Sequence, residues 1–203
     1  MRLRGTACLA ALVSSTACAP MFSDARMLRP GQVEVTPAVS PVYVTENEDT
    51  THAWNDYGVR ALFGIGSRLN IGAGYNRTEL AFEEGFGFNT IAFGPKFGLV
   101  ADRVAVAVPV GFSFGEDIEV DDTWQVHPTL LMTFPMNQRV DFNPAVRLLI
   151  PTREGADTLI AVHAGFGVRT GRHLVLRPEA AVVFNPGEDG VVWTFGLGAS
   201  LRR

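Results

Sequence analysis

The sequence predicts an all-β fold, a ten-stranded antiparallel up-and-down transmembrane β-barrel. Three observations predict it: bulky apolar residues alternate with small or polar ones in segment after segment, the connections alternate between short and long, and the number of segments is even. Side chains of a β-strand point in turn to its two faces, so each segment has one apolar face. Roughly 9–11 residues suffice for a tilted strand to cross a bilayer.

The clearest segment is 54–78, which predicts a β-hairpin. Tyr57, Val59 and Phe63 share one face of its first half, and the intervening positions are small or polar. The tripeptide 66–68, Gly-Ser-Arg, separates the halves and is a tight-turn signal. The rest of the chain repeats this pattern.

The other predicted strands show the same alternation in phase with the connections. Besides the two halves of 54–78, they are 33–43, 90–99, 104–114, 124–134, 140–150, 160–169, 174–184 and 191–201. The short turns carry arginines (Arg68, Arg103, Arg139 and Arg172), whereas the long loops are acidic, the first of them over 45–51. An even number of strands places both ends of the barrel on the side of the short turns.

Length and composition exclude several classes of protein. The chain has 203 residues, enough for one domain, and a net charge of −4, which argues against nucleic acid as a partner. Its apolar runs are shorter than the roughly 20 residues of a transmembrane helix. The chain therefore stays in water or crosses a membrane as a closed barrel.

Seven prolines fall inside predicted strands: Pro37, Pro41, Pro95, Pro109, Pro128, Pro144 and Pro178. Each lacks an N–H group, so each loses a ladder hydrogen bond or marks a bulge. A soluble lipocalin-like or sandwich fold is the alternative, and its polar face would be rich in Lys, Glu and Thr. Here that face is rich in Gly, Ala and Ser, which suits the inside of a narrow barrel and favours the membrane interpretation.

The N-terminus has the features of a targeting segment. Arg2 and Arg4 precede a short apolar stretch, and small residues lead directly to Cys18. This resembles a bacterial lipoprotein signal, in which the cysteine becomes the lipidated first residue; an ordinary secretory signal is the alternative. Cys8 leaves with the signal, so the mature chain keeps one cysteine. We expect a signal peptide over 1–17, a lipidated tether over 18–32 and the barrel over 33–203.

Residues 33–203 resemble the bacterial outer-membrane β-barrel family, with short turns on the periplasmic side and long loops outside. The resemblance implies an outer-membrane location, anchored through Cys18, and contact with outer-membrane lipid. A periplasmic or outer-membrane protein partner is left open. We expect no cofactor and a non-enzymatic structural or interaction role.

The small and polar face would carry the candidate site, a polar network inside the barrel. Its members are Arg60, Lys96, His127, Arg147, His163, Arg177 and Glu179, with Glu34 and Asp141 near the turn side. Buried charges must be paired, and Arg177 and Glu179 point the same way as the centre of a polar plug. Ten strands leave little more room than side chains fill. The second hypothesis is a narrow channel that prefers anions, because this lining is net positive.

Two further hypotheses have weaker support. Some ten-stranded outer-membrane barrels are proteases, but here only His127 and His163 face inward, and no Ser-His-Asp spacing or metal cluster stands out. The loop carrying Glu116, Asp117, Glu119, Asp121 and Asp122 offers the carboxylates that Ca²⁺ prefers, but without the spacing of a known calcium loop. We interpret it as a solvated acidic face.

Overall fold

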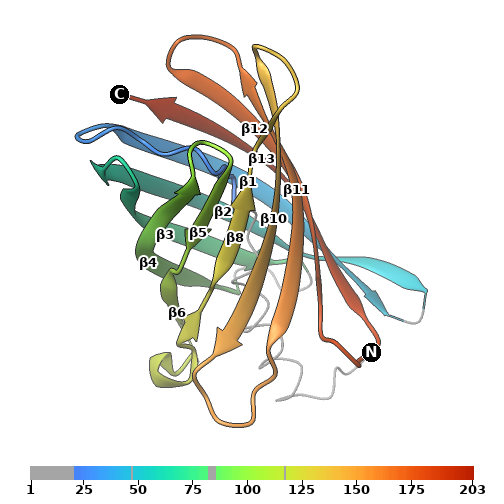
Figure 1. The fold of residues 1–203 in the computed structure, drawn as a ribbon. Coiled ribbons are helices and arrows are strands. Elements are labelled where there is room, and N and C mark those ends of the chain that lie inside the picture. The colour runs from blue at the N-terminus through green and yellow to red at the C-terminus, as the bar shows by residue number, and fades with distance from the viewer. Residues whose placement is uncertain (1–20, 47, 82–85, 117) are drawn as a thin grey trace.

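The chain folds into a closed antiparallel β-barrel of ten spans, as the sequence predicts (Figure 1). The computed structural model describes residues 21–46, 48–81, 86–116 and 118–203. The first span pairs with the last and so closes the ring, with Val35 opposite Leu201 and Tyr43 opposite Trp193. A closed barrel leaves no unpaired edge, which is the condition for a β-structure to cross a bilayer.

Eight spans are single strands, and two are interrupted. The single strands are β1 (Val33–Glu46), β2 (Asp49–Gly66), β3 (Leu69–Leu80), β4 (Gly87–Val100), β10 (Val140–Pro151), β11 (Leu159–Arg169), β12 (Leu174–Phe184) and β13 (Val191–Arg202). The fifth span consists of β5 (Val104–Ala107) and β6 (Val110–Gly115). The sixth consists of β7 (Gln125–Val126), β8 (Thr129–Met132) and β9 (Phe134–Pro135).

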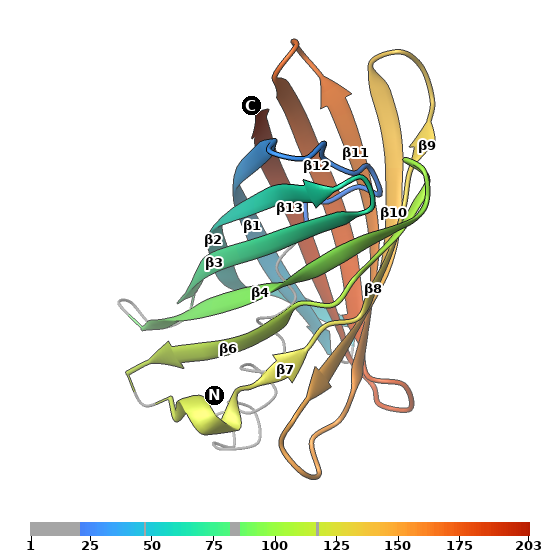
Figure 2. The same ribbon diagram turned by 60° about the vertical axis from the view of Figure 1, so that its left-hand side comes forward.

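Proline causes the main interruptions, which Figure 2 shows along the side of the barrel. Pro109 separates β5 from β6, and Pro128 separates β7 from β8. Both prolines still accept hydrogen bonds from the neighbouring chain, from His127 N at 2.8 Å and from Leu148 N at 2.9 Å. The missing N–H groups therefore break the ladder locally without opening the barrel.

The two faces of the strands follow the predicted alternation. Leu130 and Val146, which are register partners, face outward and are 40% and 37% exposed. Phe93 and Leu197 are also exposed on this outer surface, whereas Arg177 and His163 are buried inside. A water-soluble barrel would reverse this arrangement, so the apolar exterior fits a protein surrounded by hydrocarbon.

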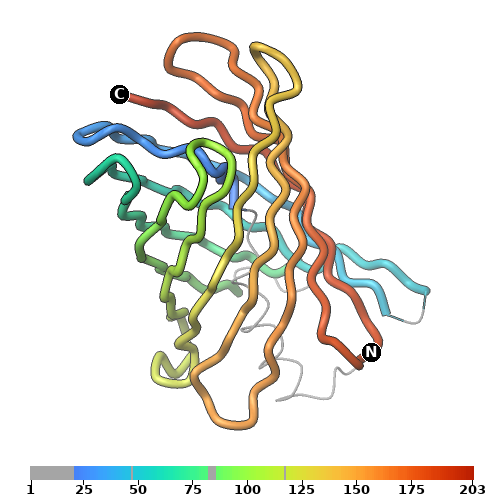
Figure 3. The backbone as a smooth tube through the Cα atoms, in the orientation of Figure 1, coloured from blue at the N-terminus to red at the C-terminus, as the bar shows by residue number. Residues whose placement is uncertain are grey.

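Short turns gather at one end of the barrel and longer connections at the other, which we call the turn end and the loop end (Figure 3). One predicted loop is different: β1 and β2 continue to a hairpin in which Glu46 pairs with Asp49, so 45–51 is mostly strand. Tyr43, Val44 and Thr45 before the acidic residues, and Thr50 and Thr51 after them, favour strand continuation there. The predicted signal peptide over 1–17 and Cys18 lie outside the described residues.

No helix in the part of the chain that the structure describes is long and apolar enough to cross a membrane.

Candidate functional site

The lumen contains the predicted polar residues and, in addition, the start of the described chain. Lys96, His127, Arg147, His163, Arg177 and Glu179 are buried inside the barrel, and Arg60 is partly buried. Between them lies the segment 21–28, which we call the N-terminal segment (dark blue in Figure 3). Its Phe22, Asp24, Ala25 and Leu28 are all at most 6% exposed.

The N-terminal segment leaves the lumen at the turn end, where it leads into β1. Gly31 N donates to Gly64 O and Gly64 N donates to Gln32 O, both at 2.9 Å, where β2 approaches its turn. A Cβ on Gly64 would lie 2.2 Å from Arg29 O. Glycine is therefore required at this position for the chain to pass inside the barrel wall.

Asp24 is the electrostatic centre of the N-terminal segment. Its Oδ2 lies 2.9 Å from Arg177 Nη2 and 3.2 Å from Arg202 Nη2, and its Oδ1 lies 4.0 Å from Lys96 Nζ. Burial alone would raise the pKa of Asp24, but the positive charges of Arg177, Lys96 and Arg202 outweigh it and hold that pKa below its ordinary value. Asp24 is therefore a charged carboxylate inside the barrel.

Glu34, at the start of β1, completes the cluster around Asp24. Its Oε2 lies 3.3 Å from Arg177 Nη2 and also accepts a hydrogen bond from Arg202 Nε, and its Oε1 lies 3.6 Å from Arg60 Nη2. Arg177 Nε donates to Ser200 Oγ at 2.6 Å. Every charge of this cluster therefore has an opposite charge beside it, as buried ions require.

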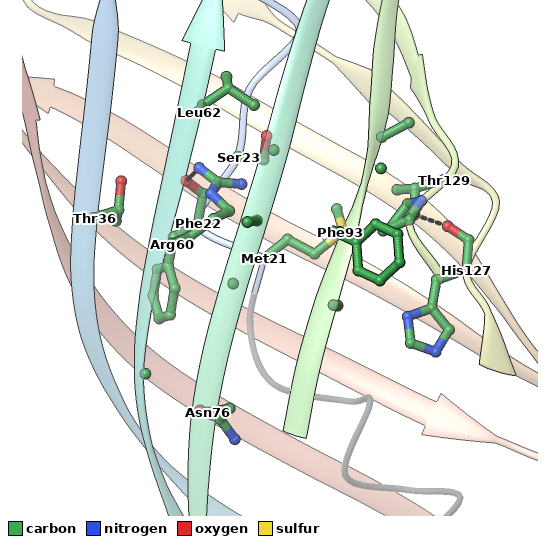
Figure 4. Close-up of a pocket in the computed structure, with 18 of the residues that line it drawn as sticks. Met21, Phe22, Ser23, Thr36, Arg60, Leu62, Asn76, Phe93, His127 and Thr129 are labelled. Carbon is green, nitrogen blue, oxygen red and sulfur yellow. Dashed lines mark hydrogen bonds between the residues drawn. The ribbon is translucent and has the colours of Figure 1, made fainter. Parts of the chain in front are cut away.

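Glu179 binds the first residues of the N-terminal segment. Its two carboxylate oxygens accept hydrogen bonds from Met21 N at 2.6 Å and Phe22 N at 2.8 Å. His163 Nδ1 lies 2.9 Å from Glu179 Oε1, and Arg60 Nη2 donates to Phe22 O at 2.7 Å (Figure 4). Glu179 is the middle residue of β12. The segment therefore reaches the middle of the barrel from the turn end.

Arg26 fixes the turn-side part of the segment. Its Nε and Nη2 donate to the two oxygens of Asp141 at 3.1 and 2.9 Å, in a bidentate pair that Arg169 extends. Burial would lower the pKa of Arg26, but the hydrogen bonds and charge of Asp141 raise it. Lys96 Nζ donates to Arg26 O at 2.7 Å.

The segment is thus held through its backbone as well as its side chains. The sequence does not predict that it lies in the lumen. Residues 18–32 are predicted to be a tether because they lack strand periodicity, yet residues 21–28 lie in the lumen. Two signals pointed inward: an excess of lumen cations that lacked anions, and the apolar Phe22 and Leu28 in a segment expected to be solvated. Arg177 and Glu179, the predicted plug centre, each bind this segment rather than each other.

The remaining candidates lie apart from this cluster. His127 Nε2 lies 3.1 Å from Gln125 Oε1, and β10 alone separates its span from β11, which carries His163. In the acidic loop, Val120–Asp122 forms a 3-10 helix, and Asp122 lies 3.6 Å from Arg153. Asp117 lies outside the described residues, among which no group of three His, Cys, Asp or Glu side chains is placed to hold a metal ion.

Comparison with known proteins relates this chain to others by fold. No family model and no curated protein matches its sequence. The translocator domain of the autotransporter NalP from Neisseria meningitidis is similar over 96% of this chain and 97% of that domain, with 10% identity and a TM-score of 0.55. Ail, the attachment invasion locus protein of Yersinia pestis, matches over 86% of this chain and 99% of its own, with 14% identity and a TM-score of 0.42. What the chain shares with the NalP domain is the architecture of an outer-membrane β-barrel.

Proposed function

We propose that this protein is a non-enzymatic outer-membrane barrel that its own N-terminal segment keeps closed, with a structural or interaction role in the membrane. The observation that supports this most strongly is the occupied lumen at Arg60, Arg177 and Glu179. A solute that crosses the barrel would have to displace paired charges from one another. Because breaking a buried ion pair costs about 3–5 kcal/mol, the closed state is strongly favoured.

The apolar exterior supports the outer membrane as the location. Side chains such as Val39, Phe93 and Leu197 face outward on every side of the barrel. Outer-membrane lipid is then the main partner of this surface. The acidic loop end is the part of the protein that would meet a protein partner outside the membrane.

We further propose that Cys18 is acylated, as the residues before it indicate. Two residues lie between it and Met21, so the joining chain spans at most about 10 Å. Met21 is bound at the middle of β12, and the lumen between it and the turn end is filled. Acyl chains on Cys18 reach a periplasmic leaflet at the turn end only when the N-terminal segment has left the lumen, so we expect the closed state in the chain that is not acylated and an open lumen in the acylated chain. Mass spectrometry of the mature protein and its Cys18→Ser variant tests the acylation.

Conductance in planar bilayers tests the closed barrel. We expect the mature Cys18→Ser chain, which carries no acyl group at this position, to show no steady ion current. A variant that also lacks residues 21–28 is expected to conduct with open steps at least tenfold larger than any seen with the chain that keeps them. A heat-modifiable mobility on electrophoresis shows that the variant still forms a barrel. Steady conductance by the Cys18→Ser chain that keeps these residues would overturn the proposed function.

A second function, an anion-preferring channel, is favoured by one observation. Asp24 supplies negative charge to Arg177, Lys96 and Arg202 at once. When the N-terminal segment leaves, these cations face the lumen with fewer counter-charges. The variant without 21–28 is then expected to pass chloride more readily than potassium, and a reversal potential that shows cation selectivity would contradict this.

A further inference from the structure

A cavity of about 200 Å³ lies in the lumen beside the tip of the N-terminal segment. Met21 and Phe22 form its floor, and its walls come from β1 to β4, the interrupted fifth and sixth spans and Arg147 of β10. Figure 4 shows these two residues together with Arg60, Thr129 and His127 around the space. The cavity belongs neither to the ion pairs that hold the segment nor to the outer surface.

Small residues create this space. Gly74, Ala92 and Ala107 occupy inward positions on three neighbouring spans that line the cavity. A Cβ on Gly74 would have Val59 O and Arg60 Cγ as its nearest neighbours, at 3.8 and 3.9 Å, so no other group fills the position. An apolar cavity of roughly 150 Å³ in another protein holds benzene. This one therefore has room for a molecule of about one aromatic ring.

One polar group in the cavity wall is incompletely hydrogen-bonded. Asp56 is 1% exposed, and its Oδ1 accepts hydrogen bonds from Thr78 Oγ1 at 2.6 Å and Asn76 Nδ2 at 2.9 Å. Its Oδ2 accepts no hydrogen bond of ordinary geometry from the described residues, and the indole Nε1 of Trp54, which interacts with Asp56 but does not meet that geometry, also lacks one. A buried carboxylate oxygen without a well-placed donor is unfavourable, so this oxygen favours a ligand that brings one.

The cations near the cavity are already engaged. Arg60 donates to Phe22 O, and Lys96 donates to Arg26 O and lies beside Asp24. The ring of His127 is paired with Gln125. These groups therefore do not favour the binding of an anionic ligand.

Two apolar clusters lie at the loop-end side of the lumen, where Ser113, Thr123 and Gln125 are buried polar residues. Val42, Trp54 and Leu80 form one buried cluster there, and Leu149, Ala161 and Val183 form a second one. A ligand that approaches from the loop end thus meets apolar side chains before it reaches Asp56. This surrounding favours an apolar molecule over a sugar or a nucleotide.

We infer that the cavity binds a small, largely apolar molecule of about one ring that carries a hydroxyl or a similar hydrogen-bond donor for Asp56 Oδ2. The inference rests on the proposed function, because the seated N-terminal segment supplies the floor. The probe is phenol, with benzene and benzoate for comparison, measured by calorimetry with the complete mature Cys18→Ser chain in lipid nanodiscs. We expect saturable binding of phenol that is at least tenfold tighter than binding of benzene or benzoate.

Two classes of variant test the position of the site. Gly74→Leu and Ala107→Leu each fill the cavity and are each expected to weaken phenol binding at least tenfold. Two variants are used so that the test still stands if one of them fails to form a barrel. Gly171→Leu, on an open turn where a Cβ meets no atom within 4 Å, is the matched control and should bind as the unaltered chain does. Asp56→Asn changes the acceptor and should abolish the preference for phenol over benzene.

The possible failures are distinguishable. Absence of saturable phenol binding by a barrel that stays closed in planar bilayers would overturn this inference and leave the proposed function standing. Equal binding by the Gly74→Leu and Ala107→Leu barrels would also overturn it, since the ligand would then lie elsewhere. Steady conductance by the Cys18→Ser chain that keeps residues 21–28 would instead contradict the proposed function itself.

Discussion

Two opposite walls of the lumen differ in what they carry. On β11–β13, the inward residues include His163, Arg177 and Glu179. Arg177 and Glu179 bind the N-terminal segment, and His163 contacts Glu179. On β3–β6, they include Gly74, Ala92 and Ala107, which leave a cavity. The difference teaches that one barrel wall can serve as a docking surface for the chain's own segment while the facing wall stays open for a ligand.

The glycines of the two walls show the same contrast. A Cβ on Gly198 of β13 would lie 2.9 Å from two atoms of the Phe22 ring, whereas one on Gly74 of β3 meets nothing closer than 3.8 Å. Gly198 makes room for the N-terminal segment, and Gly74 makes room for the cavity. The same residue type therefore has opposite consequences on the two walls.

The largest expected effect comes from removing the charge at the centre of the charged wall. Asp24→Asn leaves Arg177, Lys96 and Arg202 with one counter-charge fewer and should destabilise the seated segment by about 3 kcal/mol. The measurement is the midpoint of urea unfolding in detergent, together with the frequency of open steps in planar bilayers. Asp189→Asn, in an exposed loop, is the control and should change stability by less than about 0.5 kcal/mol. Equal effects of the two variants would show that Asp24 does not hold the segment.

A smaller effect is expected from alanine at the two glycines. Gly198→Ala forces Phe22 to move and should cost about 1–2 kcal/mol, within the usual range for overpacking. Gly74→Ala has room for its methyl group and should be neutral or slightly stabilising, by up to about 0.5 kcal/mol, because glycine weakens a strand. Urea unfolding of both variants measures the difference, and a larger loss at Gly74 than at Gly198 would reverse the comparison.

The smallest effect concerns pH. The pKa of seated Asp24 lies below its ordinary value, so its contribution is complete above roughly pH 4–5 and is lost as the pH falls towards the seated pKa. We expect no change in conductance between pH 5 and 8, and open steps only in stronger acid. Glu34, Asp141 and Glu179 are the other carboxylates that face this segment. Opening on a shift from pH 8 to pH 6 would contradict this account.

Sequence reasoning was most successful where a period exists. The alternation of residues such as Tyr57, Gly58 and Val59 fixes which face is outward, and ten such stretches in phase predict the closed barrel. The breaks at Pro109 and Pro128 follow from a missing N–H group. The continuation of β1 and β2 through the acidic hairpin is not predicted, because the acidic residues there indicate a loop, whereas charge alone does not end a strand.

The occupied lumen was out of reach of the same reasoning. The N-terminal segment has no period, and its position depends on contacts such as Asp24 with Arg177, which are 153 residues apart in the chain. Charge balance is the signal that pointed to it, since Arg177, Arg202 and Arg60 share the single strand carboxylate of Glu34. The cavity beside it exists because the inward residues Gly74, Ala92 and Ala107 have little or no side chain, and no sequence motif marks such a group of small residues.

Thiol labelling tests most directly whether the N-terminal segment is seated in the lumen. Ala25 is fully buried in this segment, so a Cys18→Ser, Ala25→Cys protein carries its one cysteine, after removal of the signal, at a buried position. A Ser67→Cys protein in the same background presents its cysteine on the exposed turn between β2 and β3. If seating is worth about 3 kcal/mol, a bulky maleimide should react roughly 100-fold more slowly at position 25 than at position 67. Equal rates at the two positions in the folded barrel would contradict the closed lumen on which the account depends.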